Sequence, residues 1–416
     1  MMRIYVLLFT VVILAGFFEP TIAQQEESSN PFSLSVTYTV DIFGNFNGGN
    51  ATGLRYMDNL DVNLEAHFET LPFGLGGTTF YVYGLGNQGS GISALTGDIQ
   101  GVSNIETENS WRIFEAWVQK KFFLANSSLL VGLYDINSEF NVLNSSLLFL
   151  NSSHGLDPTI ASSGVMGPST FPYTSLAARL KINPFSGMVI QGAVLDGVPS
   201  DPANSKGTKV KLRKSNGVFV IGEVGYHSVS GMELQQRNRT SRRQNLLAPG
   251  ISSDNSIALG GWFYSDKRDT FTDGYQQTEF GIYALGEYEI LTESEGEQIP
   301  ESLQIFGRAG ISNTEVQEIG GFFGAGFVVK GLFKQRSKDQ SGFAVAWASA
   351  GTEYINNTFI GDGRPEKAET NFELTHLFSL NDYADLQLNT QYILNPGFNP
   401  VLDNAMVGGL RLILGF

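Results

Sequence analysis

The chain has 416 residues, of which 42% are hydrophobic and 12% aromatic, and its formal net charge is −15. This acidic balance argues against nucleic-acid partners, which need a basic surface, and it disfavours an anion pore lined by lysines. The sequence contains no cysteine, so disulfides and thiolate metal sites are excluded and neither stabilises the fold.

Residues 1–23 have the features of a secretory signal. Arg3 precedes an apolar run that ends near Phe18, and small residues lie just before Gln24. The apolar run is only about 15 residues long, whereas a membrane-spanning helix needs about 20. We therefore predict a signal peptide at 1–23 and a single mature domain at 24–416.

The rest of the chain is a series of short segments in which apolar and polar residues alternate, separated by breaks rich in Gly, Asn, Ser and Asp. This pattern is typical of strands that have one face toward lipid and the other toward water. In chain order the expected strands are Ser33 to Asp41, Val62 to Phe68, Thr79 to Gly84, Trp111 to Gln119, Leu129 to Leu133, Leu176 to Ile182, Met188 to Asp196, Val218 to Tyr226, Ile257 to Tyr264, Phe280 to Ile290, Leu303 to Ile311, Phe322 to Phe333, Phe343 to Ser349, Phe372 to Leu380, Leu386 to Ile393 and Met406 to Phe416.

The last segment indicates how the sheet ends. Leu410, Leu412, Leu414 and Phe416 share one face of a strand, and Arg411 lies on the other. A terminal strand of this kind would be an unprotected edge in a soluble sandwich, whereas in a barrel it pairs with the first strand. We therefore predict an all-β fold, a transmembrane antiparallel barrel in the bacterial outer membrane.

The mature chain provides about 25 residues for each of sixteen strands with its connection, which suits a barrel of this kind. We predict 16 strands, with 18 as the alternative, and constricting loops. The longer breaks are candidate external loops, at Gly44 to Asp58, Asn87 to Glu108, Phe140 to Phe171, Gln235 to Asp254, Glu293 to Glu301 and Asn356 to Thr370.

Several short motifs lie in order along most of the mature chain. They are Glu115-x-Trp117-x-Gln119, Gly132-x-x-Asp135-x-Asn137-x-Glu139-Phe140, Tyr173 before Leu176 and Arg179, Val194-Leu-Asp196-Gly197-Val-Pro199, Asp385-Leu-Gln387, Tyr392, Asn395-Pro396-Gly397 and Leu410-Arg411. In these motifs the sequence resembles the carbohydrate-selective porin family typified by OprB. The resemblance implies a lumen narrowed by folded-in loops, through which sugars pass by diffusion.

A sugar is neutral and covered in hydroxyls, so a selective constriction needs paired donors and acceptors together with aromatic faces. Strand parity predicts which side chains face the lumen: if Phe114, Ala116 and Val118 face lipid, their neighbours face inward, whereas Arg112 has the lipid parity. The predicted pore-lining residues are Glu115, Trp117, Gln119, Arg179, Asp196, Glu223 and Arg308. For each of them the alternative is a solvated lumen charge or an interfacial aromatic.

Other function classes remain as alternatives. The chain has four histidines and no HExxH, GxSxG or P-loop motif, so a barrel enzyme has little support. A general porin shares the fold and differs only in showing no competition by sugars. A structural or adhesive barrel would have a plugged lumen. We expect no cofactor and no metal site; the expected partners are sugars or other small polar solutes, outer-membrane lipid and lipopolysaccharide, with a homotrimer as a possible assembly.

Two charged loops stand out beside the strands. Arg237 to Arg243 is a dense basic cluster, and Glu293 to Glu301 is a dense acidic one. An external basic loop could bridge lipopolysaccharide phosphates or exclude cations, and it could equally be a solvated loop. Neither loop decides the function.

Overall fold

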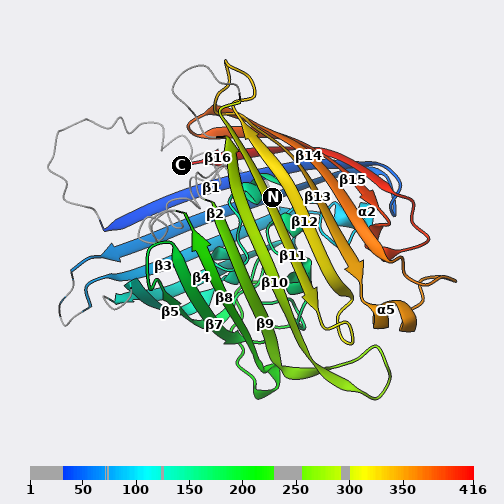
Figure 1. Cartoon of the computed structure of the whole chain (residues 1–416), viewed down its shortest axis with the longest axis horizontal. Coiled ribbons are helices and arrows are strands. Elements are labelled where there is room, and N and C mark those ends of the chain that lie inside the picture. The colour runs from blue at the N-terminus through cyan, green and yellow to red at the C-terminus, as the bar shows by residue number, and fades with distance from the viewer. Residues whose placement is uncertain (1–30, 71, 73–74, 123–125, 229–254, 292–299) are drawn as a thin grey trace, which may run out of the picture. The chain divides into compact units, whose positions relative to one another are not determined.

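The computed structural model describes residues 31–70, 72, 75–122, 126–228, 255–291 and 300–416. In this part of the chain, antiparallel strands form a closed barrel in which each strand pairs with its neighbours in sequence (Figure 1). The predicted signal sequence lies outside the described residues. The strands are β1 (Phe32–Asn47), β2 (Gly53–Phe68), β3 (Thr78–Gly89), β4 (Ser110–Phe122), β5 (Ser127–Tyr134), β6 (Ser175–Ile182), β7 (Met188–Asp196), β8 (Val218–His227), β9 (Ser256–Asp269), β10 (Gln276–Leu291), β11 (Ser302–Ser312), β12 (Ile319–Lys330), β13 (Gln340–Ala350), β14 (Ala368–Asn381), β15 (Ala384–Leu394) and β16 (Ala405–Gly415).

The barrel closes as the sequence predicts, and each of the sixteen expected segments lies within or largely within one of these strands. β1 pairs with β16 in a ladder that runs from Thr37 opposite Gly415 to Asn47 opposite Met406. Leu410 is 46% exposed on the outer face, whereas Arg411 is 5% exposed in the interior. The prediction of 16 strands is therefore confirmed, and the alternative of 18 is not.

Because neighbouring strands are antiparallel, the connections alternate between the two ends of the barrel. We call the end where β1 begins and β16 stops the terminal end, and the opposite end the loop end. The connections at 90–109, 135–174, 197–217 and 351–367 lie at the loop end.

Two predicted external loops do not belong with that group. The connections after β8 and after β10 leave from the terminal end, because His227 pairs with Ser256 there and β10 runs in the same direction as β8. The basic cluster Arg237 to Arg243, and all but the last two residues of the acidic stretch Glu293 to Glu301, lie outside the described residues.

The predicted loop from Gly44 to Asp58 is mostly strand. β1 continues to Asn47 and β2 already begins at Gly53, with Gly44 paired opposite Leu54. A Cβ on Gly44 would lie 2.8 Å from Leu54 Cδ2 and 3.0 Å from Phe46 Cζ. Glycine here gives room for two packed neighbours, so its presence did not indicate a turn.

The described helices are short and occur in the connections between strands. None of those in the described residues is long and apolar enough to cross a membrane. They are α2 (Ser93–Thr96), η3 (Ile136–Ser138), η4 (Ser145–Leu148), η5 (Ser152–His154), α3 (Pro158–Ala161), η6 (Lys214–Asn216), α5 (Thr352–Asn357) and η7 (Pro396–Phe398).

Candidate functional site

The connection between β5 and β6, residues 135–174, lies inside the barrel, and we call it the inner loop (teal in Figure 1). It contains η3, η4, η5 and α3. Phe140 and Leu148 are fully buried and Phe149 is 1% exposed. The ring of Phe149 lies 5.5 Å from that of Phe306 on β11. The inner loop therefore packs against a wall formed by strands much later in the sequence.

The inner face of β13 provides the space for this packing. Its inward residues are Gly342, Ala344, Ala346 and Ala348, all of them small and buried. A Cβ on Gly342 would lie only 2.7 Å from Phe149 Cζ. A run of small side chains on one parity of a strand thus makes a recess for a large loop side chain.

Carboxylates on the inner wall accept hydrogen bonds from the backbone of the inner loop. Buried backbone N–H groups that have no hydrogen-bond partner within a helix or sheet need another acceptor, and a carboxylate is a strong one. The donors come from several turns of the loop, so the anchors are spread over its length. They are Asn141 N to Glu223 (2.9 Å), Ser145 N to Glu287 (2.8 Å), Leu150 N and Asn151 N to Glu373 (2.6 and 3.0 Å) and Gly164 N to Glu279 (3.0 Å).

Arg308 on β11 binds the same loop with its guanidinium. Its Nη1 donates to Asn141 Oδ1 at 3.2 Å, and its Nη2 donates to Ser146 Oγ at 3.0 Å. Arg308 is 2% exposed. Because Asn141 also donates to Glu223, the two predicted residues Glu223 and Arg308 meet at one residue of the inner loop.

His154 is a fully buried residue at the end of η5. Its ring lies 5.1 Å from Phe149 and 5.8 Å from Phe306. Burial, together with the charge of nearby Arg308, lowers the pKa of His154 to about 3. The imidazole is therefore neutral at neutral pH and acts here as a packed ring.

A second cluster holds the start of the inner loop against β4 and β6. Arg179 is 1% exposed, and its Nε lies 2.7 Å from Glu139 Oε2. Its Nη2 donates to Gln119 Oε1 at 2.8 Å. On β4, Trp117 Nε1 donates to Glu115 Oε1 at 3.3 Å. Arg179 thus connects Glu139 of the inner loop to Gln119, and Glu115 and Trp117 contact each other on the same face of β4.

The same cluster receives the backbone where β5 ends. Asp135 N donates to Glu115 Oε1 at 3.1 Å, and the Asp135 side chain accepts from Asn137 N to begin η3. The Trp117 ring stacks on Tyr81 with centroids 4.8 Å apart. Glu115 thus fixes the direction in which the chain leaves β5 and enters the lumen.

The connection 90–109 between β3 and β4 also folds inward. Glu369 on β14 accepts from Ile99 N at 2.9 Å and Gln100 N at 3.1 Å. Arg411 forms a two-bond pair with Asp41 at 2.7 Å, and Ser103 Oγ donates to Asp41 at 2.7 Å. This connection narrows the lumen on the side of β14, β16 and β1.

A cavity of about 460 Å³, lined by both polar and apolar side chains, remains beside the two folded-in connections. Its lining combines carboxylates, amides, cations and the aromatic rings of Tyr83 and Phe171. The charged lining residues are Asp61, Glu106, Asp135, Glu139, Glu223, Glu287, Lys181 and Arg411. Donors and acceptors for a hydroxylated solute are thus present around the open part of the lumen.

The structure places six of the predicted pore-lining residues in the interior. Glu223 lines the cavity. The other five, Glu115, Trp117, Gln119, Arg179 and Arg308, are buried in the contacts described above. They bind the inner loop or one another, and sequence parity alone could not distinguish such contacts from an exposed pore surface.

Asp196 was wrongly predicted to face the lumen. It has the same parity in β7 as Ile190 and Val194, which are 38% and 48% exposed on the outer face. Asp196 lies at the end of the strand, where its Oδ1 accepts from Val198 N at 2.9 Å and Asn216 Nδ2 at 2.8 Å. Its role is to bind the following connection on the outside of the barrel.

A β-bulge overturns the predicted parity at the start of β4. The register shifts where Tyr83 pairs with Glu115 and Gly84 with Ile113, so Phe114 is an extra residue. Phe114 is 1% exposed and was wrongly expected to face lipid. Beyond the bulge the alternation reverses, so Arg112 is also buried, at 8% exposed, and not on the lipid face.

The wall carboxylates Glu279, Glu287, Glu369 and Glu373 were missed as candidates. The parity test would have found them, because Glu287 alternates with outward Tyr288 and Glu373 with outward Leu374. Their partners are backbone N–H groups of distant loops, which no sequence pattern indicates. In the described part of the chain, no cluster of three or more His, Cys, Asp or Glu residues could hold a metal ion.

Comparison with known proteins gives one family and a set of similar folds. Residues 51–416 match the model of the carbohydrate-selective porin, OprB family, whereas no curated protein matches the sequence. The high-pH structure of Pseudomonas putida OprB aligns with a TM-score of 0.77 at 19% identity, over 93% of this chain and 94% of that one.

Two further solved structures are less similar. The low-pH structure of P. putida OprB aligns with a TM-score of 0.55 at 15% identity, over 93% of both chains. The outer membrane channel DcaP of Acinetobacter baumannii aligns with a TM-score of 0.53 at 11% identity, over 92% of this chain and 97% of that one. At these identities the structural likenesses show the fold alone.

Proposed function

The chain belongs to the OprB family of carbohydrate-selective porins, and on this premise we propose that sugars diffuse through it along the cavity beside the inner loop. The family and the fold are those of an outer-membrane channel.

The observation that carries the proposal is the pairing of polar groups at the cavity wall. Glu223 accepts from Gln191 Nε2 at 2.9 Å and from Tyr283 OH at 2.8 Å. Lys181 lies 3.3 Å from Glu139. A hydroxyl both donates and accepts, so a neutral sugar can bridge such neighbours without bringing a charge of its own. Tyr83 and Phe171 line the same cavity and would supply aromatic surface for the apolar side of a sugar.

Single-channel conductance of the refolded protein in a planar bilayer tests the proposal. Glucose and larger sugars are titrated at fixed salt, with size-matched uncharged polyols as the comparison. We expect saturable blockade by sugars and weaker blockade by polyols. Steady conductance without blockade would indicate a general porin, and no conductance would favour a closed barrel with another role.

The variant Glu223→Gln tests the position of the site. It removes a charge and an acceptor from the cavity wall, so we expect sugar blockade to weaken about tenfold, the effect of losing one charged hydrogen bond. Glu315→Gln is the matched control, because Glu315 is exposed in the turn between β11 and β12. Equal sugar affinity in both variants would contradict a site at Glu223.

We propose that Glu115, Gln119, Arg179 and Arg308 are positioning residues, which act on solutes by holding the inner loop. Trp117 supports Glu115 in the same cluster. A change at Arg308, for example Arg308→Gln, should therefore broaden the conductance distribution as well as weaken blockade. A change confined to sugar affinity would instead indicate direct contact.

The proposal includes export and assembly. Residues 1–23 would be removed, and N-terminal sequencing of protein from outer membranes should give a chain that begins at Gln24. Association as a homotrimer is tested by cross-linking in the membrane. The proposed channel needs neither a cofactor nor chemical turnover.

A further inference from the structure

The connection between β7 and β8, residues 197–217, carries a basic cluster that the channel does not use; we call it the outer basic loop. Five of the 26 Lys and Arg residues lie between 206 and 214, in a chain whose net charge is −15. Asp201 is the only acid in the connection, and it pairs with Lys211 and Arg213. Lys206, Lys209 and Lys214 form no ion pair with any residue that the structure describes.

The outer basic loop is bound to the part of β4 nearest the loop end of the barrel. β5 pairs with β4 only from Ala116 to Phe122, which leaves the backbone of Ile113 without a strand partner there. Thr208 Oγ1 accepts from Ile113 N at 2.6 Å and donates to Ile113 O at 3.0 Å. Gly207 N donates to Ser110 Oγ at 2.9 Å. The cations are therefore held in place beside the barrel.

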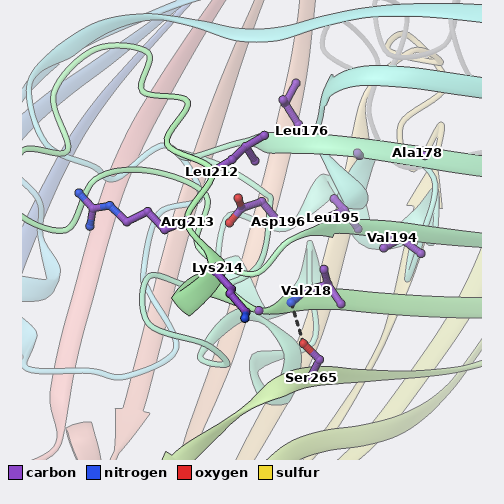
Figure 2. A pocket seen from close by; sticks show the side chains of 12 residues that line it. Leu176, Ala178, Val194, Leu195, Asp196, Leu212, Arg213, Lys214, Val218 and Ser265 are labelled. Atoms are coloured by element: carbon purple, nitrogen blue, oxygen red, sulfur yellow. Dashed lines mark hydrogen bonds between the residues drawn. The ribbon is translucent and has the colours of Figure 1, made fainter.

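Between this loop and the outer wall lies an open groove of about 540 Å³ (Figure 2). Its floor is mostly apolar: Leu176, Ala178, Val194 and Val218 come from the outward faces of β6, β7 and β8. One carboxylate, Asp196, also lines the groove, and its Oδ1 accepts hydrogen bonds from Val198 N and Asn216 Nδ2. Leu212 of the loop, 67% exposed, faces the same groove. Arg213 and Lys214 lie at its rim. An apolar floor beside a basic rim fits an amphiphile with an acyl chain and an anionic head group.

We propose that this groove binds a phosphorylated lipid of the leaflet at the loop end, and that its occupant is the diphosphorylated lipid A part of lipopolysaccharide. The acyl chain would lie along Leu176 and Val194, and the phosphates would meet Arg213 and Lys214 at the rim. Long connections of outer-membrane barrels face outward, so the leaflet at the loop end is the outer one. The groove lies outside the lumen, so this inference does not depend on which solute the channel admits.

Native mass spectrometry of the detergent-purified full chain tests the proposal with added diphosphoryl lipid A. The variant Lys206→Gln, Lys209→Gln, Lys214→Gln removes the three cations of the outer basic loop that form no ion pair with a described residue. Near a membrane surface each cation contributes roughly fivefold to the binding of an anionic lipid, so we expect binding to weaken on the order of 100-fold. The matched control is Lys330→Gln, Lys334→Gln, Lys338→Gln at the terminal end, which should bind as the unmodified chain does.

A second variant, Ala178→Phe, fills the groove floor and leaves every cation in place. It should also weaken binding of lipid A, whereas a site that needs only phosphate would be unaffected. Both variants should keep the unmodified single-channel conductance, which shows that the barrel has formed. Competition by free pyrophosphate at equal concentration, or binding unchanged by the triple lysine variant, would overturn the proposal.

Discussion

At the residue scale, the carboxylates of the inner wall hold the inner loop by accepting hydrogen bonds from its backbone N–H groups. Glu373 is fully buried and receives Leu150 N, Asn151 N and Asn389 Nδ2. A carboxylate with three donors is a strong anchor, and replacing it leaves donors without an adequate acceptor in a dry interior. The free energy that holds the inner loop is therefore concentrated in a few side chains of the wall.

Glu373→Gln should release the middle of the inner loop. Loss of a charged acceptor costs about 2 kcal/mol, which corresponds to an increase of about 30-fold in the open population. Because the chain has no cysteine, Ser153→Cys, at a residue 1% exposed, is a single reporter of that opening. The measurement is its rate of thiol labelling.

The control for this experiment is Glu315→Gln in the same reporter background, which should leave labelling unchanged. If Glu373→Gln and Glu315→Gln gave the same labelling rate, Glu373 would not be an anchor of the inner loop.

His154 should make the inner loop sensitive to acid. Its pKa is about 3 in the folded loop, against an ordinary value of 6.5. Between these two pH values, His154 binds a proton in the released loop and stays neutral in the folded loop. The contribution of His154 to the stability of the folded loop is therefore fully present above pH 6.5 and is lost as the pH falls toward 3. At pH 4.5 the loss is on the order of 3 kcal/mol. We expect conductance noise to rise between pH 7.5 and pH 4.5.

His154→Phe keeps the packing against Phe149 and Phe306 and removes the titrating group. Its noise should rise less over the same pH range, and because other acidic groups titrate equally in both proteins, the difference reports His154. Identical pH profiles for the two proteins would contradict this role.

Most residues that strand parity assigned to the interior do lie there, and the exceptions have local causes. Arg179 and Arg411 follow simple alternation in strands without irregularity. Phe114 and Arg112 do not, because one extra residue at a bulge reverses every face that precedes it. Asp196 lies at a strand end, where a polar side chain on the outer parity can bind a connection and leave the apolar band. Bulges and strand ends carry no signal in the alternation itself.

At the scale of elements, β13 and the inner loop form a matched pair. The inward side chains of β13 are small where Leu148 and Phe149 of the loop are large. Gly342→Leu should displace this part of the loop, because overpacking of a filled interior costs about 1–3 kcal/mol. The measurement is the distribution of single-channel conductance, which should broaden.

The control for Gly342→Leu is Ala309→Leu, which adds a similar volume on the exposed outer face of β11. It should give the unmodified distribution. A narrow, unchanged distribution for Gly342→Leu would mean that the loop adjusts without loss of order.

The strands could be predicted from the sequence, whereas the position of the connections and the residues that they contact could not. Alternation indicated all sixteen strands, because each strand has one lipid face. The break from Phe140 to Phe171 was recognised as long, but nothing in its composition showed that it enters the lumen. That follows from contacts with Glu287, Arg308 and Glu373, which lie far away in the chain.

At the scale of the whole molecule, the charge of the lumen is uneven. The cavity is lined by six carboxylates, at Asp61, Glu106, Asp135, Glu139, Glu223 and Glu287, against Lys181 and Arg411. A narrow passage with this excess attracts cations and repels anions. The acidic balance of the sequence therefore extends to the path that solutes take.

The channel should accordingly prefer potassium over chloride. The measurement is the reversal potential across a gradient of potassium chloride. The preference should shrink as salt rises from 0.1 to 1 M, since the screening length falls from about 10 to about 3 Å. Lys181→Gln should strengthen it, and preference for chloride in the unmodified protein would contradict the electrostatic picture.

The inner loop also has a consequence for the order of assembly. It follows β5, yet its partners Glu287, Arg308 and Glu373 lie 142, 162 and 223 residues later in the chain than the loop atoms that they bind. The strands up to β8 hold only the start of the loop, through Glu115, Arg179 and Glu223. The middle of the loop binds later strands, so no early hairpin of the barrel can hold the whole loop in its final place. The constriction is thus completed late in biogenesis, after the later strands have formed. A partly assembled barrel would have a wide lumen that does not yet select among solutes.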